Sequence, residues 1–477
     1  MLENDLKELV IEIQKQKCEN NYLELKAAKD GCPKLYDTFS SFSNQDGGGK
    51  IVFGIDSNYE VCGVYDADDL QKKIMERSME MYPEIRPLCS TVSIDGKTVV
   101  CAEIPEIDNF EKPCFYKGAG RLRGSYIRVG DGDLRMSEYE VYSYEAFKKK
   151  IKDELRTDST AEFEDIQTDF VDIYLPALKK KKPNLAGLSK EKIERLQSIV
   201  LHDKITLAAI MLFGDYPQAF YPQLSITAVV VPGTEKSIVG DVGERFIDNA
   251  RIEGNLIQML NGAMHFVRRN MKMRTIIDPE TGKRADRSEY PVVAVRELIL
   301  NALIHRDYSI HTDSTPIVIE MYSDRFVIEN PGGLYGRMTL DQLGKISADT
   351  RNPVIANAME VLDQTENRYS GIPTIRSAMK EFSLPEPVFA NERGVFRVTL
   401  YNRVIRPKKT TKVPFRDEIL EFCKTPRSRA ELEEYFKGRK TIAYLQKTVI
   451  RPMIEAGELG MTIPDKPKSK LQKYYTE

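Results

Sequence analysis

Two carboxylates and a lysine close to the amino terminus stand at a spacing that lets them meet. Glu24 and Lys26 alternate along the predicted strand LELKAA, so their side chains point to the same face. Glu19 precedes them across an Asn-Asn turn, and Asp56 ends the predicted strand KIVFGID. Carboxylates hold Mg²⁺ or Mn²⁺, and a neighbouring lysine can neutralise a phosphate. These residues are the parts of a metal-assisted phosphodiesterase site; surface ion pairs, the usual role of acid–lysine pairs on a strand, are the alternative interpretation.

Basic residues and a tyrosine gather in and around the segment GAGRLRGSYIRVG. Cations along a groove bind phosphates, an aromatic ring stacks on a base, and glycines let the backbone approach a ligand. The alternative is a solvated strand edge that charge protects from association. The candidate nucleic-acid-binding residues are Lys50, Lys117, Arg121, Arg123, Tyr126 and Arg128.

A second pair of polar residues shares one face of a predicted helix. Glu297 and Asn301 lie one helical turn apart in RELILNALIHRDY. A glutamate can orient a water molecule and an asparagine oxygen can coordinate Mg²⁺, which together suit nucleotide binding. Such pairs in helices also serve purely structural roles. The Pro-Gly-Gly turn that follows at residues 331–333 favours the nucleotide interpretation.

Several folded segments must position these residues, because 477 residues exceed one ordinary domain. Residues 1–145 have the pattern of a mixed α/β unit with short strands, and residues 146–203 that of a charged helical linker. Residues 204–405 predict a second α/β region with its core at residues 291–402. Residues 412–477 contain short helices, a Ser-x-x-Glu capping box and two tail strands, the outline of a winged helix; a three-helix interaction module is the alternative interpretation. We therefore predict an α/β (α+β) multidomain protein.

The composition limits the classes of partner. Seventy Lys and Arg against 72 Asp and Glu give a net charge of −2, so a nucleic-acid surface must be a local patch. The seven cysteines form no C-x-x-C pair, which argues against a disulfide framework and a thiolate zinc site. The sequence has no long apolar run and begins with a charged amphipathic helix. We expect a cytoplasmic protein without a membrane partner.

The order of the amino-terminal motifs resembles the AlbA-like (AlbA_2) domain of the Schlafen family. These motifs are E-x-x-x-x-E-x-K, F-x-N-x-x-G-G, V-F-G-I-D and G-S-Y-I-R-V-G, and they extend over roughly residues 10–140. The resemblance implies RNA binding and, as in several Schlafen proteins, metal-dependent cleavage of transfer RNA. It implies that Glu19, Glu24 and Asp56 are catalytic and hold the metal, with Lys26 beside them. The family strand ends in two consecutive acids, and Ser57 occupies the second position here.

The run EL-LNALIHRDYS…IEMYSDRFVIENPGGL…TRNPVIANAM resembles the divergent ATP-binding domain of the gyrase, Hsp90 and histidine-kinase (GHKL) superfamily, an α/β sandwich. The resemblance implies water activation by Glu297 and magnesium binding by Asn301. It places Pro331, Gly332 and Gly333 in the turn beside adenine, and Gly371 in the lid over the phosphates. Two departures are clear: ENPGG replaces the usual Asp-Gly-x-Gly, and Gly371 is the glycine left in the lid segment ENRYSGIPTI.

Together these patterns favour a Schlafen-like, Mg²⁺- or Mn²⁺-dependent endoribonuclease that acts on tRNA or structured RNA in defence or stress, regulated by the nucleotide-binding domain. The alternatives are a non-catalytic, ATP-responsive DNA-binding transcriptional regulator and a weak ATPase that remodels a partner. We expect a homo-oligomer, because both resembled domains pair with copies of themselves. If the winged-helix segment binds nucleic acid, the phosphate contacts would come from Arg427, Arg429, Lys440, Lys447 and the lysines of residues 466–473; an ordinary solvated wing is the alternative.

Overall fold

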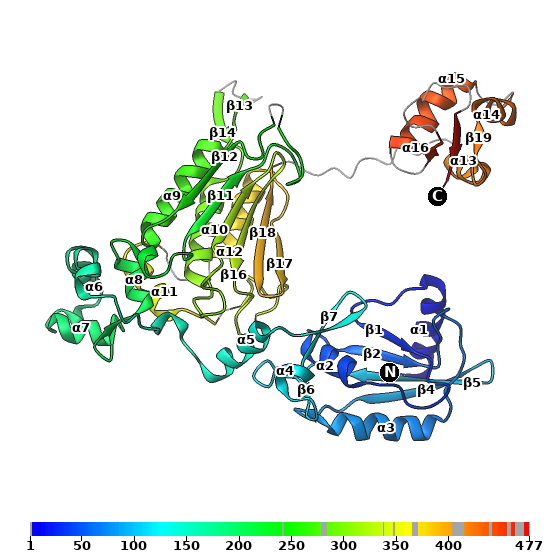
Figure 1. Ribbon diagram of the computed structural model, residues 1–477, viewed down its shortest axis with the longest axis horizontal. Coiled ribbons are helices and arrows are strands. Elements are labelled where there is room, and N and C mark those ends of the chain that lie inside the picture. Colours follow the sequence, from blue (N-terminus) through cyan, green and yellow to red (C-terminus); the bar gives the residue numbers. More distant parts are fainter. Residues whose placement is uncertain are drawn as a thin grey trace. The chain divides into compact units, whose positions relative to one another are not determined.

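The computed structural model has a mixed α/β architecture, as predicted, and forms two compact units, Met1–Arg403 and Val404–Glu477 (Figure 1). No helix in the part of the chain that the structure describes is long and apolar enough to cross a membrane. The structure describes residues 2–240, 243–277, 284–336, 338–346, 349–364, 371–402, 415–437, 441–455, 459–462 and 472–476.

The amino-terminal part of the first unit is built on a four-stranded sheet in the order β1-β2-β5-β4. Strand β1 (Leu23–Lys26) runs parallel to β2 (Gly49–Phe53), and β5 (Lys97–Ile104) and β4 (Leu88–Ile94) continue antiparallel. Helix α1 (Glu3–Gln16) packs on one face with its buried residues Leu6, Val10 and Ile13. Helices α2 (Tyr36–Asn44) and α3 (Ala67–Met79) pack on the other face. Successive residues of the central strands point to opposite faces of the sheet, and many of them are apolar. Helices can therefore pack against both faces.

Smaller elements flank this sheet. Strands β3 (Met81–Tyr82) and β6 (Phe115–Tyr116) pair, the short helix α4 (Arg121–Gly124) follows, and β7 (Tyr126–Val129) and β8 (Gly132–Arg135) form a hairpin against α2. Helix α5 (Glu138–Lys149) begins at a capping box made by Ser137 and Glu140. The linker after α5 contains α6 (Leu175–Lys181), α7 (Lys190–Leu196) and the short strands β9 (Val200–Leu201) and β10 (Lys204–Ile205).

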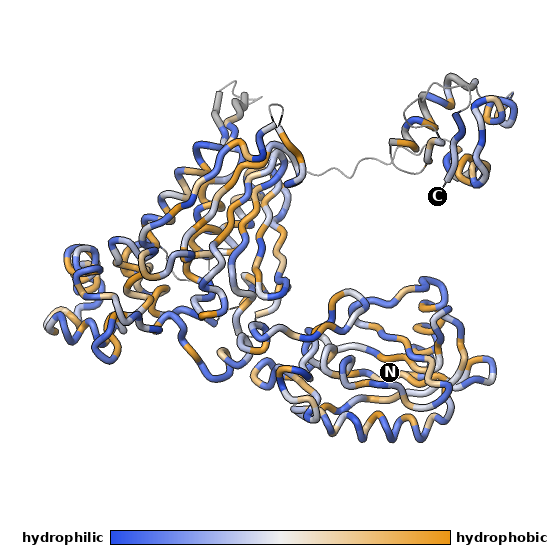
Figure 2. Tube along the Cα trace, in the orientation of Figure 1, coloured by the Kyte–Doolittle hydropathy of each residue, from blue (hydrophilic) through white to orange (hydrophobic). Residues whose placement is uncertain are grey.

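The second α/β region contains a six-stranded sheet in the order β12-β11-β15-β16-β18-β17. Helices α9 (Leu256–Asn270), α10 (Val292–His305) and α12 (Gly371–Glu381) lie on one face of it (Figure 1). Figure 2 shows apolar residues concentrated along the central strands and the helices that cover them. Helices α8 (Leu207–Phe213) and α11 (Pro353–Val361) pack together, and β13 (Met273–Ile277) pairs with β14 (Arg284–Ser288). The sheet consists of β12 (Asp248–Ile252), β11 (Ile226–Val230), β15 (Ile317–Met321), β16 (Arg325–Pro331), β18 (Val395–Tyr401) and β17 (Val388–Glu392).

The carboxy-terminal unit has a separate core that includes Ile419, Leu432, Phe436, Met453 and Tyr474. It contains the predicted helices, the capping box between Ser428 and Glu431 and the paired tail strands. A third strand, β19, joins this sheet in the order β19-β21-β20 and was not predicted. The elements are α13 (Arg416–Phe422), β19 (Arg427–Ser428), α14 (Arg429–Tyr435), α15 (Ile442–Leu445), a π-helical turn (Gln446–Ile450), α16 (Arg451–Glu455), β20 (Gly460–Met461) and β21 (Lys473–Tyr475).

Candidate functional site

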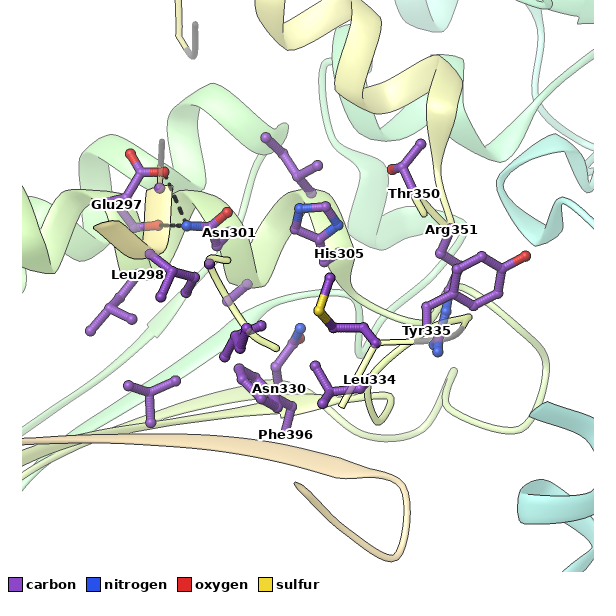
Figure 3. A pocket seen from close by; sticks show the side chains of 18 of the residues that line it. Glu297, Leu298, Asn301, His305, Asn330, Leu334, Tyr335, Thr350, Arg351 and Phe396 are labelled. Carbon is purple, nitrogen blue, oxygen red and sulfur yellow. Dashed lines mark hydrogen bonds between the residues drawn. The ribbon is translucent and has the colours of Figure 1, made fainter. Parts of the chain in front are cut away.

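A pocket of about 890 Å³ opens between α10, the end of β16, residues 338–346 and 349–351, and the start of α12 (Figure 3). Glu297, Asn301, Gly332, Gly333 and Gly371, which lie far apart in the sequence, all line it. The pocket therefore brings together most of the residues proposed for nucleotide binding. Apolar side chains form much of its wall: Leu298, Ile328, Leu334, Met338, Leu343, Phe396 and Val398.

Glu297 and Asn301 contact each other on the pocket face of α10. The Asn301 Nδ2 group donates to Glu297 Oε1 at 3.0 Å and to the Glu297 carbonyl at 2.8 Å. Burial raises the pKa of Glu297, and the hydrogen bond from Asn301 opposes that shift. With its nitrogen turned to Glu297, the Asn301 amide leaves its oxygen pointing away from Glu297 (Figure 3). The pair thus offers a proton acceptor and a neutral oxygen ligand side by side.

Gly371 opens α12 directly against this pair. A Cβ atom at this position would lie 2.5 Å from Glu297 Oε1 and 3.0 Å from Asn301 Nδ2. Glycine therefore lets the amino-terminal end of α12, with its backbone N–H groups, approach the two polar side chains. Free backbone N–H groups and the helix dipole at such an end favour an anion. The rest of the predicted lid, residues 365–370, lies outside the described residues.

Asn330 is a pocket residue that the sequence analysis noted only as a departure from a motif. Its side chain lines the pocket, yet the residue is 6% exposed. Within the described part of the chain, its buried Oδ1 atom has no hydrogen-bond partner. An unsatisfied buried acceptor is costly, so a ligand donor such as an amino group would be favoured there. The signal in the sequence was the polar residue directly before the Pro-Gly-Gly turn.

The Pro-Gly-Gly turn is fixed by a buried ion pair. Arg351 Nη1 lies 2.6 Å from Asp307 Oδ2, and both side chains are almost fully buried. Gly332 has φ +107°, and a Cβ there would lie 2.6 Å from Arg351 Nη1, so a side chain would collide. Pro331 is buried, and its carbonyl accepts from Asp307 N at 2.9 Å; it is not among the described residues that line the pocket. Its predicted place beside a ligand is therefore taken by Gly332 and Gly333.

The His-Arg-Asp-Tyr run at the end of α10 divides between two environments. His305 is exposed to the pocket, where the surrounding protein and the charge of Arg351 lower the pKa of its imidazole. Arg306 is buried and donates to the carbonyls of Thr312 and Thr315 at 2.8 and 2.7 Å. The Tyr308 hydroxyl donates to the Leu303 carbonyl at 2.8 Å. Of these residues, His305 faces the pocket, and Arg306 and Tyr308 stabilise the fold.

The amino-terminal acids form a smaller cluster at β1. Glu24 and Lys26 are ion-paired, which confirms that their side chains share one face of the strand. Glu19 Oε1 accepts the Leu25 N–H at 2.7 Å. Burial and the nearby charge of Glu24 raise the pKa of Glu19, opposed by that hydrogen bond and by Arg128. Glu19 and Glu24 are therefore close enough to interact, in a partly enclosed place.

Asp56 has separate partners. Its Oδ1 accepts from the backbone N–H groups of Asn58 and Glu60 at 3.0 and 3.2 Å, and its Oδ2 lies 3.9 Å from Lys29 Nζ. These contacts close the turn after β2. Within the described ranges, no group of three or more His, Cys, Asp and Glu residues is arranged to hold a metal ion.

Arg128 does not reach a nucleic-acid surface, contrary to the sequence analysis. Its side chain is 0% exposed and lies 2.8 Å from Glu24 Oε2 and 2.9 Å from Asp133 Oδ1. The reason is that β7 packs against α2, where Thr38 and Ser41 also donate to Asp133. Arg128 therefore holds the Glu24 carboxylate in place from within the folded domain.

The other basic candidates differ in their surroundings. Lys117 is paired with Glu84, and Arg121 with Glu145. Arg123 is exposed, and Tyr126 and Lys50 are half-buried. In the carboxy-terminal unit, Arg427 is paired with Glu431. Lys440, the lysines of residues 466–471 and the side chain of Lys447 lie outside the described residues.

Comparisons with known proteins match two parts of the chain. The family described as "Schlafen, AlbA_2" matches residues 19–137, and the family described as "Putative ATP-dependent DNA helicase recG C-terminal" matches residues 314–400. No curated protein matches the chain.

Two solved structures are similar to the chain. The DIP2311 protein from Corynebacterium diphtheriae is 18% identical, with a TM-score of 0.37, over 84% of this chain and 82% of that chain. The N-terminal domain of the "Putative ATP-dependent DNA Helicase RecG-related Protein" from Nitrosomonas europaea is 26% identical, with a TM-score of 0.22, over 27% of this chain and 92% of that chain. Both superpositions are loose, so the family matches carry the assignment. The chain combines a Schlafen AlbA_2 domain at residues 19–137 with a GHKL-like ATPase domain that includes residues 314–400.

Proposed function

We propose that the chain binds RNA through its AlbA_2 domain and ATP with Mg²⁺ in the pocket between α10 and α12, and that the bound nucleotide regulates the RNA-directed activity. One observation carries the nucleotide part of this proposal. Glu297 and Asn301 of α10, Asn330 of β16 and Gly371 of α12, from three separate places in the sequence, meet around one pocket of about 890 Å³.

The residues present fit an adenine nucleotide. Asn330 Oδ1 is the unsatisfied acceptor for a base amino group, and the apolar wall with Phe396 and Val398 suits a flat ring. The amide end of α12, held close by Gly371, suits phosphates. Asn301 would bind the magnesium ion and Glu297 would orient a water molecule. Nucleotide binding would rest on the Asn330 acceptor, the apolar wall and the N–H groups at the start of α12. Hydrolysis would need Glu297 in addition.

Both family descriptions support nucleic acid as the partner. The AlbA_2 domain is of the Schlafen type, and the second family is described as a part of a DNA helicase. We propose RNA as the partner of the AlbA_2 domain. A DNA-binding regulator that responds to ATP without catalysis is the alternative.

Cleavage of RNA is a second candidate function, and the proximity of Glu19 and Glu24 favours it. Two neighbouring carboxylates with a lysine beside them can hold Mg²⁺ or Mn²⁺ at a phosphodiester. Asp56 is engaged in its own turn, so the acids that would hold the metal are Glu19 and Glu24. The metal would then compete with Arg128 and Lys26 for Glu24.

The test is incubation of total tRNA with the protein and Mn²⁺ or Mg²⁺, with and without ATP, followed by denaturing and native gels. The matched variant is Glu19→Gln with Glu24→Gln, because glutamine keeps the shape and a hydrogen-bond acceptor beside the buried Arg128, whereas alanine would leave Asp133 as its one remaining partner among these contacts. Cleavage by the wild type alone would support the nuclease. A gel shift by both proteins without cleavage would support the RNA-binding regulator, and absence of both would contradict the RNA proposal.

ATP binding is tested separately, by titration of a fluorescent ATP analogue with Mg²⁺. We expect saturable binding that unlabelled ATP displaces. Binding that survives replacement of Asn330 by leucine would contradict the assignment of the pocket, since leucine removes the amide acceptor.

A further inference from the structure

A second pocket, of about 450 Å³, lies on the face of the AlbA_2 sheet that α1 covers. It is bordered by the turn before β1, the glycine turn before β2 and the ends of β4 and β5. None of the acids proposed for chemistry lines it. Its wall combines an aromatic ring, cations and apolar side chains: Tyr22, Lys50, Arg86, Leu9, Leu88 and Pro105.

Tyr22 presents an open ring on a fixed backbone. The residue is 56% exposed, although it sits between two ordered elements. Its N–H donates to Asn20 Oδ1 at 2.8 Å, and its carbonyl accepts from Lys50 N at 2.8 Å. An aromatic ring with a held backbone and an uncovered face can stack on a planar group at a small entropic cost.

The glycine turn beside the ring keeps it uncovered. A Cβ atom at Gly47 would lie 4.0 Å from the Tyr22 ring, and Gly47 and Gly48 have φ +79° and +69°. A Cβ at Gly48 would lie 2.2 Å from the Ile104 carbonyl, so the turn is pressed against β5. Larger residues could not keep this turn, and the turn places no side chain over the ring.

Two cations in this pocket form no ion pair with a described carboxylate. Among the residues that the structure describes, neither Lys50 nor Arg86 is within ion-pair distance of a carboxylate. By contrast, Lys26, Lys117, Arg121 and Arg128 each have one. Glu103 also lines the pocket, so its charge is mixed rather than uniformly positive. Unpaired cations beside an open aromatic ring are the combination that binds single-stranded nucleic acid.

The pocket also adjoins the acid cluster. Asn20, which lines it, is the neighbour of Glu19 in the chain. Arg128, the partner of Glu24, lies 3.4 Å from the Asn20 carbonyl. A single-stranded nucleic acid held in this pocket would therefore pass close to Glu19 and Glu24.

We propose that this pocket is a nucleotide subsite for single-stranded RNA, in which an unpaired base stacks on Tyr22 while Lys50 and Arg86 contact the flanking phosphates. The inference rests on the proposed RNA-binding function and specifies where and how an unpaired nucleotide is held. Leu88, 68% exposed at the rim, adds an apolar contact for the sugar or base.

The experiment is a fluorescence anisotropy titration of labelled oligo(U) with the full chain, without divalent metal. We expect Tyr22→Ala to weaken binding about fivefold or more, the usual effect of losing one stacking platform. Tyr22→Phe keeps the ring and should bind within about twofold of the wild type. Lys50→Ala with Arg86→Ala should weaken binding and lower the slope of log affinity against log salt by about one to two. The matched control is Tyr216→Ala, because Tyr216 is 52% exposed but lies in the other α/β region.

The outcomes separate this inference from the function on which it rests. If the wild type does not bind oligo(U) or tRNA, the proposed RNA function fails. If the wild type binds RNA, and both Tyr22→Ala and the Lys50→Ala, Arg86→Ala variant bind it as tightly as the wild type does, the RNA function stands and the subsite is overturned. If Tyr22→Phe weakens binding as much as Tyr22→Ala, stacking is overturned. Binding of oligo(dT) but not oligo(U) would overturn RNA as the ligand. Unchanged melting temperatures would show that the variants fold.

Discussion

At the scale of single residues, burial separates charged side chains that look equivalent in the sequence. Arg128 and Arg123 lie in the same segment, yet the Arg128 side chain is 0% exposed between Glu24 and Asp133, and Arg123 is exposed. Removing one partner from a buried ion pair leaves an uncompensated charge, which costs far more than losing a surface charge. Arg128 therefore belongs to the folding of this domain.

Replacing Arg128 by methionine should lower the free energy of unfolding by about 3–5 kcal/mol, because Glu24 and Asp133 lose their buried partner. The matched change Arg123→Met should alter it by less than about 0.5 kcal/mol. Thermal unfolding followed by circular dichroism would compare the two variants. Equal effects of the two changes would contradict the assigned role of Arg128.

Gly371 supplies a residue-scale test of the nucleotide pocket. A methyl group there would lie 2.5 Å from Glu297 Oε1, so Gly371→Ala should displace the Glu297–Asn301 pair and weaken ATP binding about tenfold or more. Gly187→Ala is the control, because a Cβ at Gly187 meets nothing within 4 Å. Titration of the fluorescent ATP analogue measures both. Equal affinities of the two variants would show that α12 does not approach the ligand here.

At the scale of elements, a buried carboxylate from the linker fixes one helix of the ATPase region. Glu154 is 0% exposed, and its oxygens accept from the N–H groups of Val354 and Ile355 at 2.9 and 3.0 Å, in the first turn of α11. This carboxylate satisfies free donors at the helix start and lies at the favourable end of the helix dipole. The linker is thus part of the second α/β region, although its sequence has the pattern of a charged connector.

The same contact predicts a pH dependence. Burial raises the pKa of Glu154 to about 7 from the ordinary value of 4.5, against the lowering effect of the two N–H donors. Between these values the folded chain binds more protons at Glu154 than the unfolded chain does, so the free energy of unfolding falls as pH rises. Glu154→Gln should reduce that fall. The test is the difference between the melting temperatures at about pH 5 and about pH 7.5, with Glu164→Gln at an exposed position as the control. If this difference is the same in Glu154→Gln as in the wild type, the prediction is wrong.

At the scale of the whole molecule, α5 links the two sites within the first unit. The Tyr139 hydroxyl donates to Asp307 at 2.8 Å, and Asp307 is paired with Arg351, which lines the pocket between α10 and α12. Further along α5, Phe147 packs edge-on against Tyr335, a pocket residue, at 5.3 Å between ring centroids. Phe147 also stacks on Phe110 of the AlbA_2 domain, 4.8 Å away. One helix thus contacts both the pocket wall and the nucleic-acid-binding domain.

These contacts predict coupling between ATP and RNA. We expect each ligand to change the affinity for the other by the same factor, about 5- to 150-fold, since coupling is reciprocal. Phe147→Ala should reduce this factor, because it removes the contacts to both Tyr335 and Phe110. RNA titrations with and without ATP, and ATP titrations with and without RNA, measure it; Tyr216→Phe is the control. A factor unchanged by Phe147→Ala would exclude α5 as the link.

The expected homo-oligomer also belongs to this scale. Light scattering coupled to size-exclusion chromatography, with and without ATP, would give the mass of the particle. A single-chain mass in both conditions would contradict the expectation of self-association.

The sequence by itself determined the features that depend on local spacing. Strand alternation put Glu24 and Lys26 on one face, the helical repeat put Glu297 and Asn301 in contact, and the Ser428–Glu431 capping box began α14. These relations involve residues a few positions apart, where backbone geometry alone sets the direction of each side chain. The motif order also identified both domain families correctly.

The tertiary structure alone decided which distant residues meet and which side chains are buried. It engaged Asp56 in the turn after β2, enclosed Arg128, left the Asn330 oxygen unsatisfied in the pocket between α10 and α12 and placed Tyr22 beside Lys50 and Arg86. The physical reason is that burial and long-range contact follow from how sheets and helices pack. That packing is set by the whole apolar pattern and has no signature at any one residue.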